Sequence, residues 1–222
     1  MGDRKFNFSI GEFYHIYSRG TDRRSIFLES EDWERFRKLL FLCNSSKGIV
    51  FSRVPAGKAY IHNRGETLVD IGAFCFMANH FHLLLHEKIE NGVSFFMLKL
   101  LTAYSGYFNK RHGRTGGLFE GKFKAVHADT DEYLKYLFSY IHLNPIKHIY
   151  PDWKKVGIEN IEKAKEYLLG YSYSSYFEYI GLEREEAKIL NKEAFPEYFL
   201  DFKEFDQFVN EWLAFKNVSG ID

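Results

Sequence analysis

Cysteine and long apolar runs are both scarce in this sequence. The two cysteines, Cys43 and Cys75, lie far apart and form no CxxC pair of the kind that binds a metal. We therefore expect two reduced thiols in the core of a cytoplasmic protein. The chain has no run of about eighteen apolar residues, the length that spans a bilayer, so no membrane span is expected. The opening residues, MGDRKFNFSIGEF, lack the apolar stretch of a secretory signal, which also favours the cytoplasm and no membrane partner.

Net charge is absent as well, because 30 Lys and Arg balance 30 Asp and Glu. Taken alone, that balance argues against a nucleic-acid partner. The distribution is uneven, however. Residues 181–222 hold five basic and ten acidic side chains, a net charge of −5, so residues 1–180 carry +5. A mildly basic body with an acidic tail is compatible with nucleic-acid binding.

Apolar residues recur with strand or helix spacing along the first 150 residues. Strands are predicted at residues 11–20, 48–54, 69–77, 82–87 and 122–128. Helices are predicted at residues 30–43, 93–109 and 131–143. The short connection between the third and fourth strands implies an antiparallel pair. Strands that alternate with helices in this way favour an α+β fold: a ferredoxin-like antiparallel sheet with helices packed on it.

The chain after residue 150 is expected to be helical, because residues 159–169 and 203–215 carry apolar stripes. We therefore predict a domain at residues 1–150. A helical C-terminal extension at residues 151–222 would pack on it or next to it.

The segment Asn79-His80-Phe81-His82 places two imidazoles at strand positions i and i+2. Such side chains project from the same face of a sheet. Two neighbouring imidazoles suit a divalent metal. Taken alone, the pattern fits equally well a pair of packed or hydrogen-bonded histidines at a strand end.

The segment Tyr140-Ile-His-Leu-Asn144-Pro145 places a phenol and an amide at positions i and i+4, near the end of a helix. These two side chains are neighbours on one helix face. They could therefore converge on one site. The alternative is an aromatic core residue followed by an Asn cap.

Together the two patterns resemble the HUH superfamily of single-strand nucleases: HxH on a strand, then Tyr-x-x-x-Asn-Pro near a helix end. The chain is most similar to the single-tyrosine transposases, and among them to the REP-associated tyrosine transposases. The segments that carry the resemblance are FYHIYSRG with DRRSIF, FMANHFHLLL, FNKRHGRTGGLFEGKFK and YIHLNPIKH. It extends over residues 11–180 in the family's order and spacing.

The resemblance implies a role for each residue of the two motifs. His80 and His82 would bind Mg²⁺ or Mn²⁺, with Asn144 as third ligand where related transposases often carry Gln. Tyr140 would be the nucleophile, giving a 5′-phosphotyrosine link and a free 3′-hydroxyl. The implied substrate is single-stranded DNA with a hairpin, and the implied enzyme is a monomer or a homodimer in the cytoplasm.

Basic side chains gather in two stretches that are candidates for DNA binding. The predicted DNA-binding residues are Arg19, Arg23, Arg24, Lys110, Arg111, Arg114, Lys122 and Lys124. Basic groups contact phosphates, and interleaved aromatic residues can stack on unpaired bases. The alternative is an ordinary solvated basic loop.

Three further residues have competing interpretations. Tyr136 lies one turn before Tyr140, and some HUH enzymes use two tyrosines, but the family pattern favours Tyr140. His86 shares a face with His80 by strand periodicity and is interpreted as structural or near the DNA. His15, inside the first strand, is interpreted as a sheet histidine whose hydrogen bonds are satisfied.

Two other functions remain open. The fold could have lost catalysis and serve as a domesticated protein that binds hairpin DNA. It could also be a metal phosphoesterase that uses water instead of tyrosine.

Overall fold

The computed structural model describes residues 7–214, so the outermost residues of both predicted domains, 1–6 and 215–222, lie outside the described part. Its centre is a four-stranded sheet in the order β2-β3-β1-β4, antiparallel throughout. The strands are β1 (Phe13–Arg19), β2 (Val69–Met77), β3 (His80–Glu87) and β4 (Lys124–His127). With one helix after β1 and one after β3, this is the ferredoxin-like arrangement, and the predicted fold class is confirmed.

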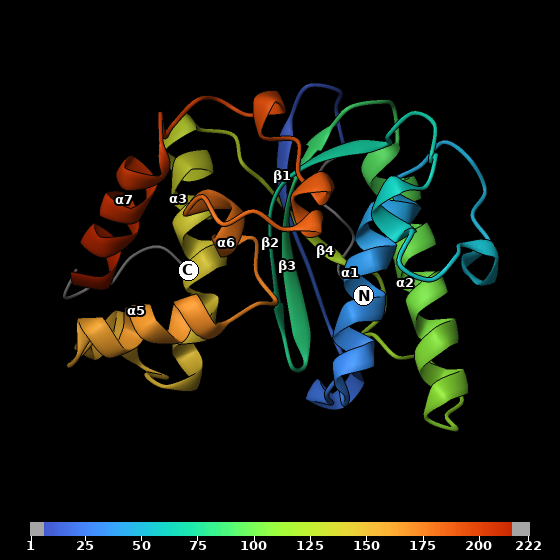
Figure 1. The fold of residues 1–222 in the computed structure, drawn as a ribbon, viewed down its shortest axis with the longest axis horizontal. Helices are drawn as coiled ribbons and strands as arrows, with labels where there is room; N and C mark the ends of the chain where they lie inside the picture. Colours follow the sequence, from blue (N-terminus) through green and yellow to red (C-terminus); the bar gives the residue numbers. More distant parts are fainter. Residues whose placement is uncertain (1–6, 215–222) are drawn as a thin grey trace.

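Helices α1 (Ser30–Cys43) and α2 (Gly92–Arg111) cover one face of the sheet. In Figure 1 they lie to the right of the strands. Their apolar faces and the sheet side chains that point toward them form the first core, in which Phe36, Phe76 and Tyr104 are fully buried. Asp32 holds the start of α1, because its carboxylate accepts the backbone N–H groups of Leu28 and Glu29 at 2.9 and 3.2 Å.

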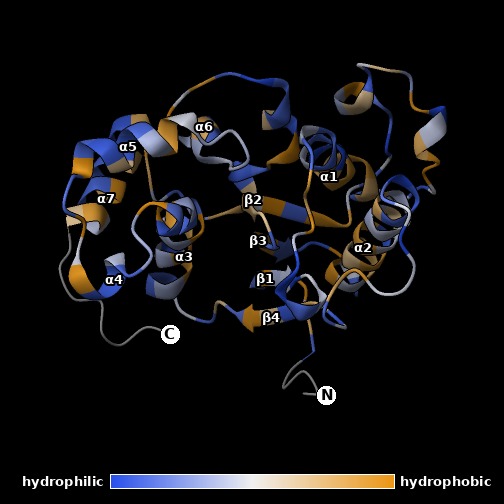
Figure 2. Cartoon of the chain, turned by 90° about the horizontal axis from the view of Figure 1, so that it is seen from below, coloured by the Kyte–Doolittle hydropathy of each residue, from blue (hydrophilic) through white to orange (hydrophobic). Residues whose placement is uncertain are grey.

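The opposite face of the sheet is covered by α3 and the helices that follow it, as Figure 2 shows with the sheet as the middle layer. These helices are α3 (Asp131–Leu143), α4 (Trp153–Val156), α5 (Ile161–Gly170), α6 (Tyr176–Tyr179) and α7 (Phe202–Ala214). Short 3-10 helices connect the elements: η1 (Thr21–Arg23), η2 (Phe51–Arg53), η3 (Ala59–Ile61), η4 (Asn144–His148), η5 (Glu185–Ile189) and η6 (Lys192–Ala194). Phe205 and Val209 of α7 are fully buried, so this helix closes the second core.

The segment after α5 also covers the outer edge of β2. The backbone N–H of Phe76 donates to the carbonyl of Tyr173 at 2.9 Å, and the N–H of Ser175 donates to the carbonyl of Phe74 at 2.9 Å. These bonds satisfy backbone groups that an edge strand otherwise leaves open. The placement of a domain boundary at residue 150 stays a prediction.

The predicted strand at residues 48–54 is wrong, since this segment forms the 3-10 turn η2 within a long loop. Its apolar residues pack locally instead of joining the sheet. The guanidinium of Arg35, on α1, lies 3.6 Å from the ring centre of Phe51. An apolar run next to Gly48 therefore reports burial against a helix, a case in which periodicity does not separate strand from loop.

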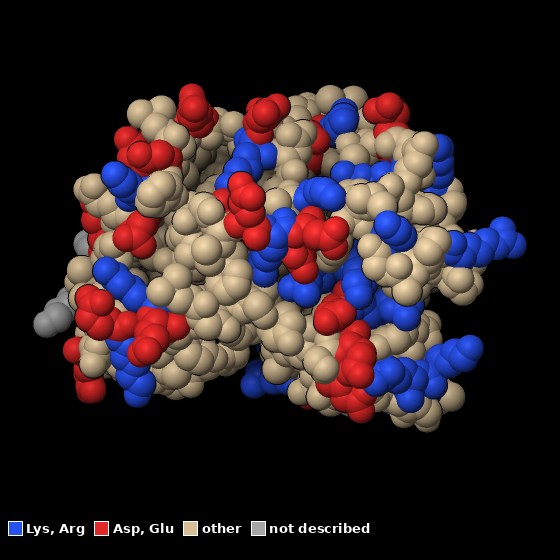
Figure 3. Space-filling view, viewed as in Figure 1, with Lys and Arg blue, Asp and Glu red and all other residues tan. Residues whose placement is uncertain are grey.

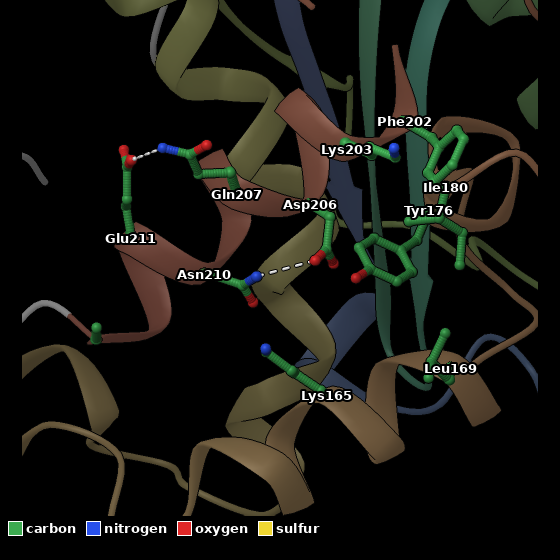
Figure 4. A pocket seen from close by; sticks show the side chains of 11 residues that line it. Lys165, Leu169, Tyr176, Ile180, Phe202, Lys203, Asp206, Gln207, Asn210 and Glu211 are labelled. Carbon is green, nitrogen blue, oxygen red and sulfur yellow. Dashed lines mark hydrogen bonds between the residues drawn. The ribbon is translucent and has the colours of Figure 1, made fainter.

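A groove of 650 Å³ opens between α5, α6 and α7 (Figure 4). Leu169 and Phe202, both about half exposed, line it together with Tyr176. None of the residues predicted from the motifs lines this groove. Among the described helices, none combines the length and the apolar character needed to cross a membrane.

Candidate active site

Three of the four motif residues meet at the start of β3, on the sheet face that α3 covers. His80 and His82 project from the same face, with ring centres 5.0 Å apart. The ring of Tyr140, on α3, stands edge-on to His82 with 5.6 Å between ring centres. The structure thus brings a phenol next to two imidazoles that are sixty residues distant in sequence.

Each of the two histidines has its Nδ1 atom held by a neighbour. Nδ1 of His80 lies 2.6 Å from the side-chain oxygen of Asn79, and Nδ1 of His82 lies 2.8 Å from Nε2 of His15. Asn79 in turn donates to the carbonyl of Arg23 at 3.2 Å, which fixes its amide. With Nδ1 engaged in this way, Nε2 is the atom that each ring can offer to a ligand.

All three imidazoles of the site are neutral at pH 7. Burial lowers the pKa of His80 and of His15 to about 4, and it lowers the pKa of His82 well below its ordinary value. Positive neighbours act in the same direction: Lys147 and Arg19 on His80, and Lys147 and Lys154 on His82. The site therefore consists of neutral donors in a positive field, which suits an anionic phosphate.

Asn144 lies beside this group rather than within it. It is the first residue of η4 and is buried. Its amide nitrogen donates to the carbonyl of Tyr140 at 2.8 Å, and its side-chain oxygen accepts from Nζ of Lys147 at 3.2 Å. Within residues 7–214, no contact joins Asn144 to either histidine.

The two histidines fit a divalent metal by their donor chemistry. A metal-binding imidazole is neutral, and its second nitrogen is held by an outer partner. His80 and His82 meet both conditions through Asn79 and His15. Between Asn7 and Ala214 no group of three or more His, Cys, Asp or Glu side chains could hold a metal ion. The set suggested by the motifs is of another kind, with two imidazoles and the amide of Asn144.

His15 does more than the sequence suggested. It is buried and bonded, as expected of a sheet histidine, but its partner is His82, and its ring lies 5.5 Å from that of Tyr140. β1 pairs with β3 so that Tyr17 stands opposite His82, which brings His15 to the same sheet face two residues away. Sequence reasoning missed this role because it depends on the register between two strands.

The two remaining candidates occupy other positions. His86 pairs with Asp70 at 2.9 Å and lies against Phe13, a structural arrangement. Tyr136 is buried against Trp212, with 4.9 Å between ring centres, and its hydroxyl accepts from Lys154 at 3.3 Å. Its ring centre lies 5.7 Å from that of Tyr140.

The basic segments meet at the end of the sheet where β3 begins. The backbone N–H of Gly20 donates to the carbonyl of Asn79 at 2.9 Å, and the N–H of Thr21 donates to the carbonyl of Leu118 at 3.0 Å. Arg19 stands opposite His80 in the β1–β3 register, and Lys124 stands opposite Tyr17 in the β1–β4 register. Arg19 and Lys124 are therefore on the sheet face that carries the site.

Three of the predicted DNA-binding arginines have acidic partners. Arg19 pairs with Glu120 at 3.1 Å, Arg24 pairs with Asp22 at 3.1 Å, and Arg111 binds Glu29 at the start of α1. Within the described chain, the other five form no ion pair with an acid: Arg23, Lys110, Arg114, Lys122 and Lys124. Over the face shown in Figure 3, acidic side chains are most frequent on the half that carries α5 and α7.

Comparison with known proteins agrees with this geometry. The family model described as "Transposase IS200 like" matches residues 58–144, which include both histidines, Tyr140 and Asn144. A solved structure described as "Structure of the REP associates tyrosine transposase bound to a REP hairpin" shares the fold with a TM-score of 0.51 and 14% identity, over 84% of this chain and 90% of that chain. None of the curated proteins matches. Fold and motifs together define a transposase of the single-tyrosine class. The chain belongs to the IS200-like transposase family, so the resemblance seen in the sequence is confirmed.

Replacing His15 with Ala should weaken Mn²⁺ binding by about 10- to 100-fold, the usual effect of removing an outer partner of a metal ligand. The reason is that His82 would lose the bond that orients its ring. Isothermal titration calorimetry without DNA measures the affinity directly. His15→Gln is the matched control, because its amide can still accept from Nδ1 of His82. Unchanged Mn²⁺ affinity in His15→Ala would show that His15 only fills space.

Neutralising Lys110, Arg111 and Arg114 together to Gln should weaken single-stranded DNA binding and flatten its dependence on salt, since fewer counterions are released. Lys110 and Arg114 should account for most of the change, because Arg111 already binds Glu29. Fluorescence anisotropy across a salt series gives the slope. If the triple variant keeps the wild-type slope, this loop does not contact the DNA.

Proposed function

We propose that this transposase is a metal-dependent endonuclease and strand transferase. It would act on single-stranded DNA that contains a hairpin and form a 5′-phosphotyrosine intermediate at Tyr140. The observation that carries the proposal is the position of the Tyr140 ring, 5.6 Å from His82 and 5.5 Å from His15 in a positively charged site.

His80 and His82 would hold Mg²⁺ or Mn²⁺ through their Nε2 atoms, with the amide oxygen of Asn144 as the third donor. Bound there, the ion would act as a Lewis acid that offsets the charge developing on the scissile phosphate. Since the donors are all neutral, the site adds no negative charge that would repel the DNA. The bond from Lys147 to Asn144 means that this amide must accept from both the ammonium and the ion, or exchange one for the other.

The chemical step is a transesterification. The phenol of Tyr140 loses its proton to solvent and its oxygen attacks phosphorus, forming an O–P bond as the P–O3′ bond breaks. The 3′-oxygen leaves and takes up a proton to become a hydroxyl. One phosphodiester replaces another, so a second 3′-hydroxyl can reverse the reaction and rejoin the strand without ATP.

The DNA would be held by the basic segments that meet at the start of β3, with Arg19 and Lys124 nearest the site in the sheet register. A hairpin is proposed as the recognised feature because the relative of similar fold was solved bound to a REP hairpin. We place the reaction in the cytoplasm, where DNA is available and where the buried thiols of Cys43 and Cys75 would stay reduced. Monomer and homodimer both remain open for the active form.

We further propose that residues 1–150 form the nuclease domain and that residues 151–222 are a helical extension packed on it. The packing of α7 on α3, the helix that carries Tyr140, supports this division of roles. Truncation at residue 150 would then leave apolar side chains of α3 exposed.

A covalent protein–DNA adduct separates this function from its two alternatives. A wild-type protein mixed with labelled hairpin oligonucleotides and Mn²⁺ should yield label that migrates with the protein on a denaturing gel. A domesticated protein that only binds hairpins would shift the DNA on a native gel and leave it uncut. Cleavage without an adduct would indicate a phosphoesterase that uses water.

A further inference from the structure

Two lysines that the motifs do not include lie against the ring of Tyr140. Nζ of Lys154, on α4, is 4.5 Å from the ring centre, and Nζ of Lys147, on η4, is 5.6 Å from it. Both residues follow the nucleophile helix in sequence, and the chain turns back to bring them to its end. Two ammonium groups thus approach the one phenol that the family pattern marks as the nucleophile.

Neighbouring side chains fix the position of each ammonium group. Lys154 donates to the hydroxyl of Tyr136 at 3.3 Å, and Lys147 donates to the side-chain oxygen of Asn144 at 3.2 Å. Lys154 also follows Trp153, whose buried ring anchors the short helix α4. Both lysines are partly buried, so water screens their charges less than it screens a surface lysine.

The charges of the two lysines reach the centre of the site. Both lower the pKa of His82, and Lys147 also lowers the pKa of His80. The side chains that contact the Tyr140 ring are His15 from β1, His82 from β3, Tyr136 from α3 and the two lysines. None of these is an acid that would oppose ionisation of the phenol.

A phenol is a poor nucleophile at pH 7, because its pKa is about 10. A positive charge within about 4–6 Å favours the ionised form of an acid. The same ammonium can contact a phosphate oxygen that approaches the phenol. Lys154 is the closer of the two lysines to the ring and is therefore the stronger candidate.

We propose that Lys154, supported by Lys147, stabilises the phenolate of Tyr140 and contacts the scissile phosphate when DNA is bound. The second part rests on the proposed function, whereas the first concerns the protein alone. Two measurements keep them apart.

The first measurement is a titration of the free protein without metal or DNA. Tyrosine labelled with ¹³C at the ζ position reports ionisation by NMR, and a Tyr140→Phe sample assigns the resonance. In Lys154→Met the pH of half-ionisation of Tyr140 should rise by about one unit. Lys155→Met, one residue further and exposed, should leave it unchanged. An equal titration in wild type and Lys154→Met would overturn the proposal.

The second measurement is the rate of adduct formation between pH 6 and pH 10. One pKa unit is a tenfold change in the ionised fraction, so Lys154→Met should react about tenfold more slowly at pH 7 and approach the wild-type rate at high pH. Lys154→Arg should restore most of the rate. A uniform loss at every pH would contradict a role in ionisation. If wild type forms no adduct, the proposed function fails, while the NMR titration still decides the role of Lys154.

Discussion

Replacing Tyr140 with Phe should reduce covalent adduct formation to background while hairpin binding is retained. The phenol oxygen is the only heavy atom removed, so the ring keeps its packing against His82 and His15. Binding should persist because contacts to phosphates and bases lie on other residues. Oligonucleotides labelled at the 5′ or 3′ end distinguish the two fragments: the downstream one should migrate with the wild-type protein, and the upstream one should run free with a 3′-hydroxyl.

Tyr136→Phe is the matched control for this experiment. Tyr136 lies one helical turn away, is buried against Trp212 and uses its hydroxyl to accept from Lys154. Its variant should keep the adduct. If Tyr140→Phe still forms the adduct and Tyr136→Phe does not, the nucleophile has been assigned one turn too late.

Replacing both His80 and His82 with Ala should abolish cleavage and weaken Mn²⁺ binding, because these rings are the two imidazole donors of the proposed site. The fold should survive, since neither residue belongs to the apolar cores on the two faces of the sheet. Cleavage assays, calorimetry with Mn²⁺ and circular dichroism test the three parts of this expectation.

His86→Ala is the control for the histidine pair. It removes an imidazole from the same strand, but one that pairs with Asp70 and takes no part in the site. Its cleavage and Mn²⁺ affinity should match those of wild type. Undiminished cleavage in the double variant would refute the assignment of the metal ligands.

The sequence was sufficient for those parts of the fold that depend on local pattern. β2 and β3 were predictable because apolar side chains dominate both strands, and α3 because Asn144-Pro145 follows its last turn. The prediction failed at residues 48–54, where apolar residues pack against α1 without joining a strand. Local pattern reports which residues are buried, but not what buries them.

The site shows the same limit. His80 with His82, and Tyr140 with Asn144, are each close in sequence, so their spacing alone places them on one face. His15, Lys147 and Lys154 reach the site only through strand register and through the return of the chain after α3. Sequence spacing carries no signal for either.

Charge pairing sets a further limit. A count of basic residues includes Arg111, but Glu29 neutralises it across the gap between α2 and α1. The two residues are far apart in sequence, and the pair becomes visible only once the helices are placed side by side. Lys110 and Arg114 of the same stretch form no such pair in the described chain.

Peptide mapping of the covalent adduct tests the central claim most directly. The wild-type protein would be incubated with a hairpin oligonucleotide and Mn²⁺, digested with a protease and a nuclease, and analysed by tandem mass spectrometry. The account predicts a peptide that contains Tyr140 and carries a nucleotide linked through its 5′-phosphate, absent when Tyr140→Phe is used. A nucleotide on any other residue, or cleaved DNA with no modified peptide, would contradict it.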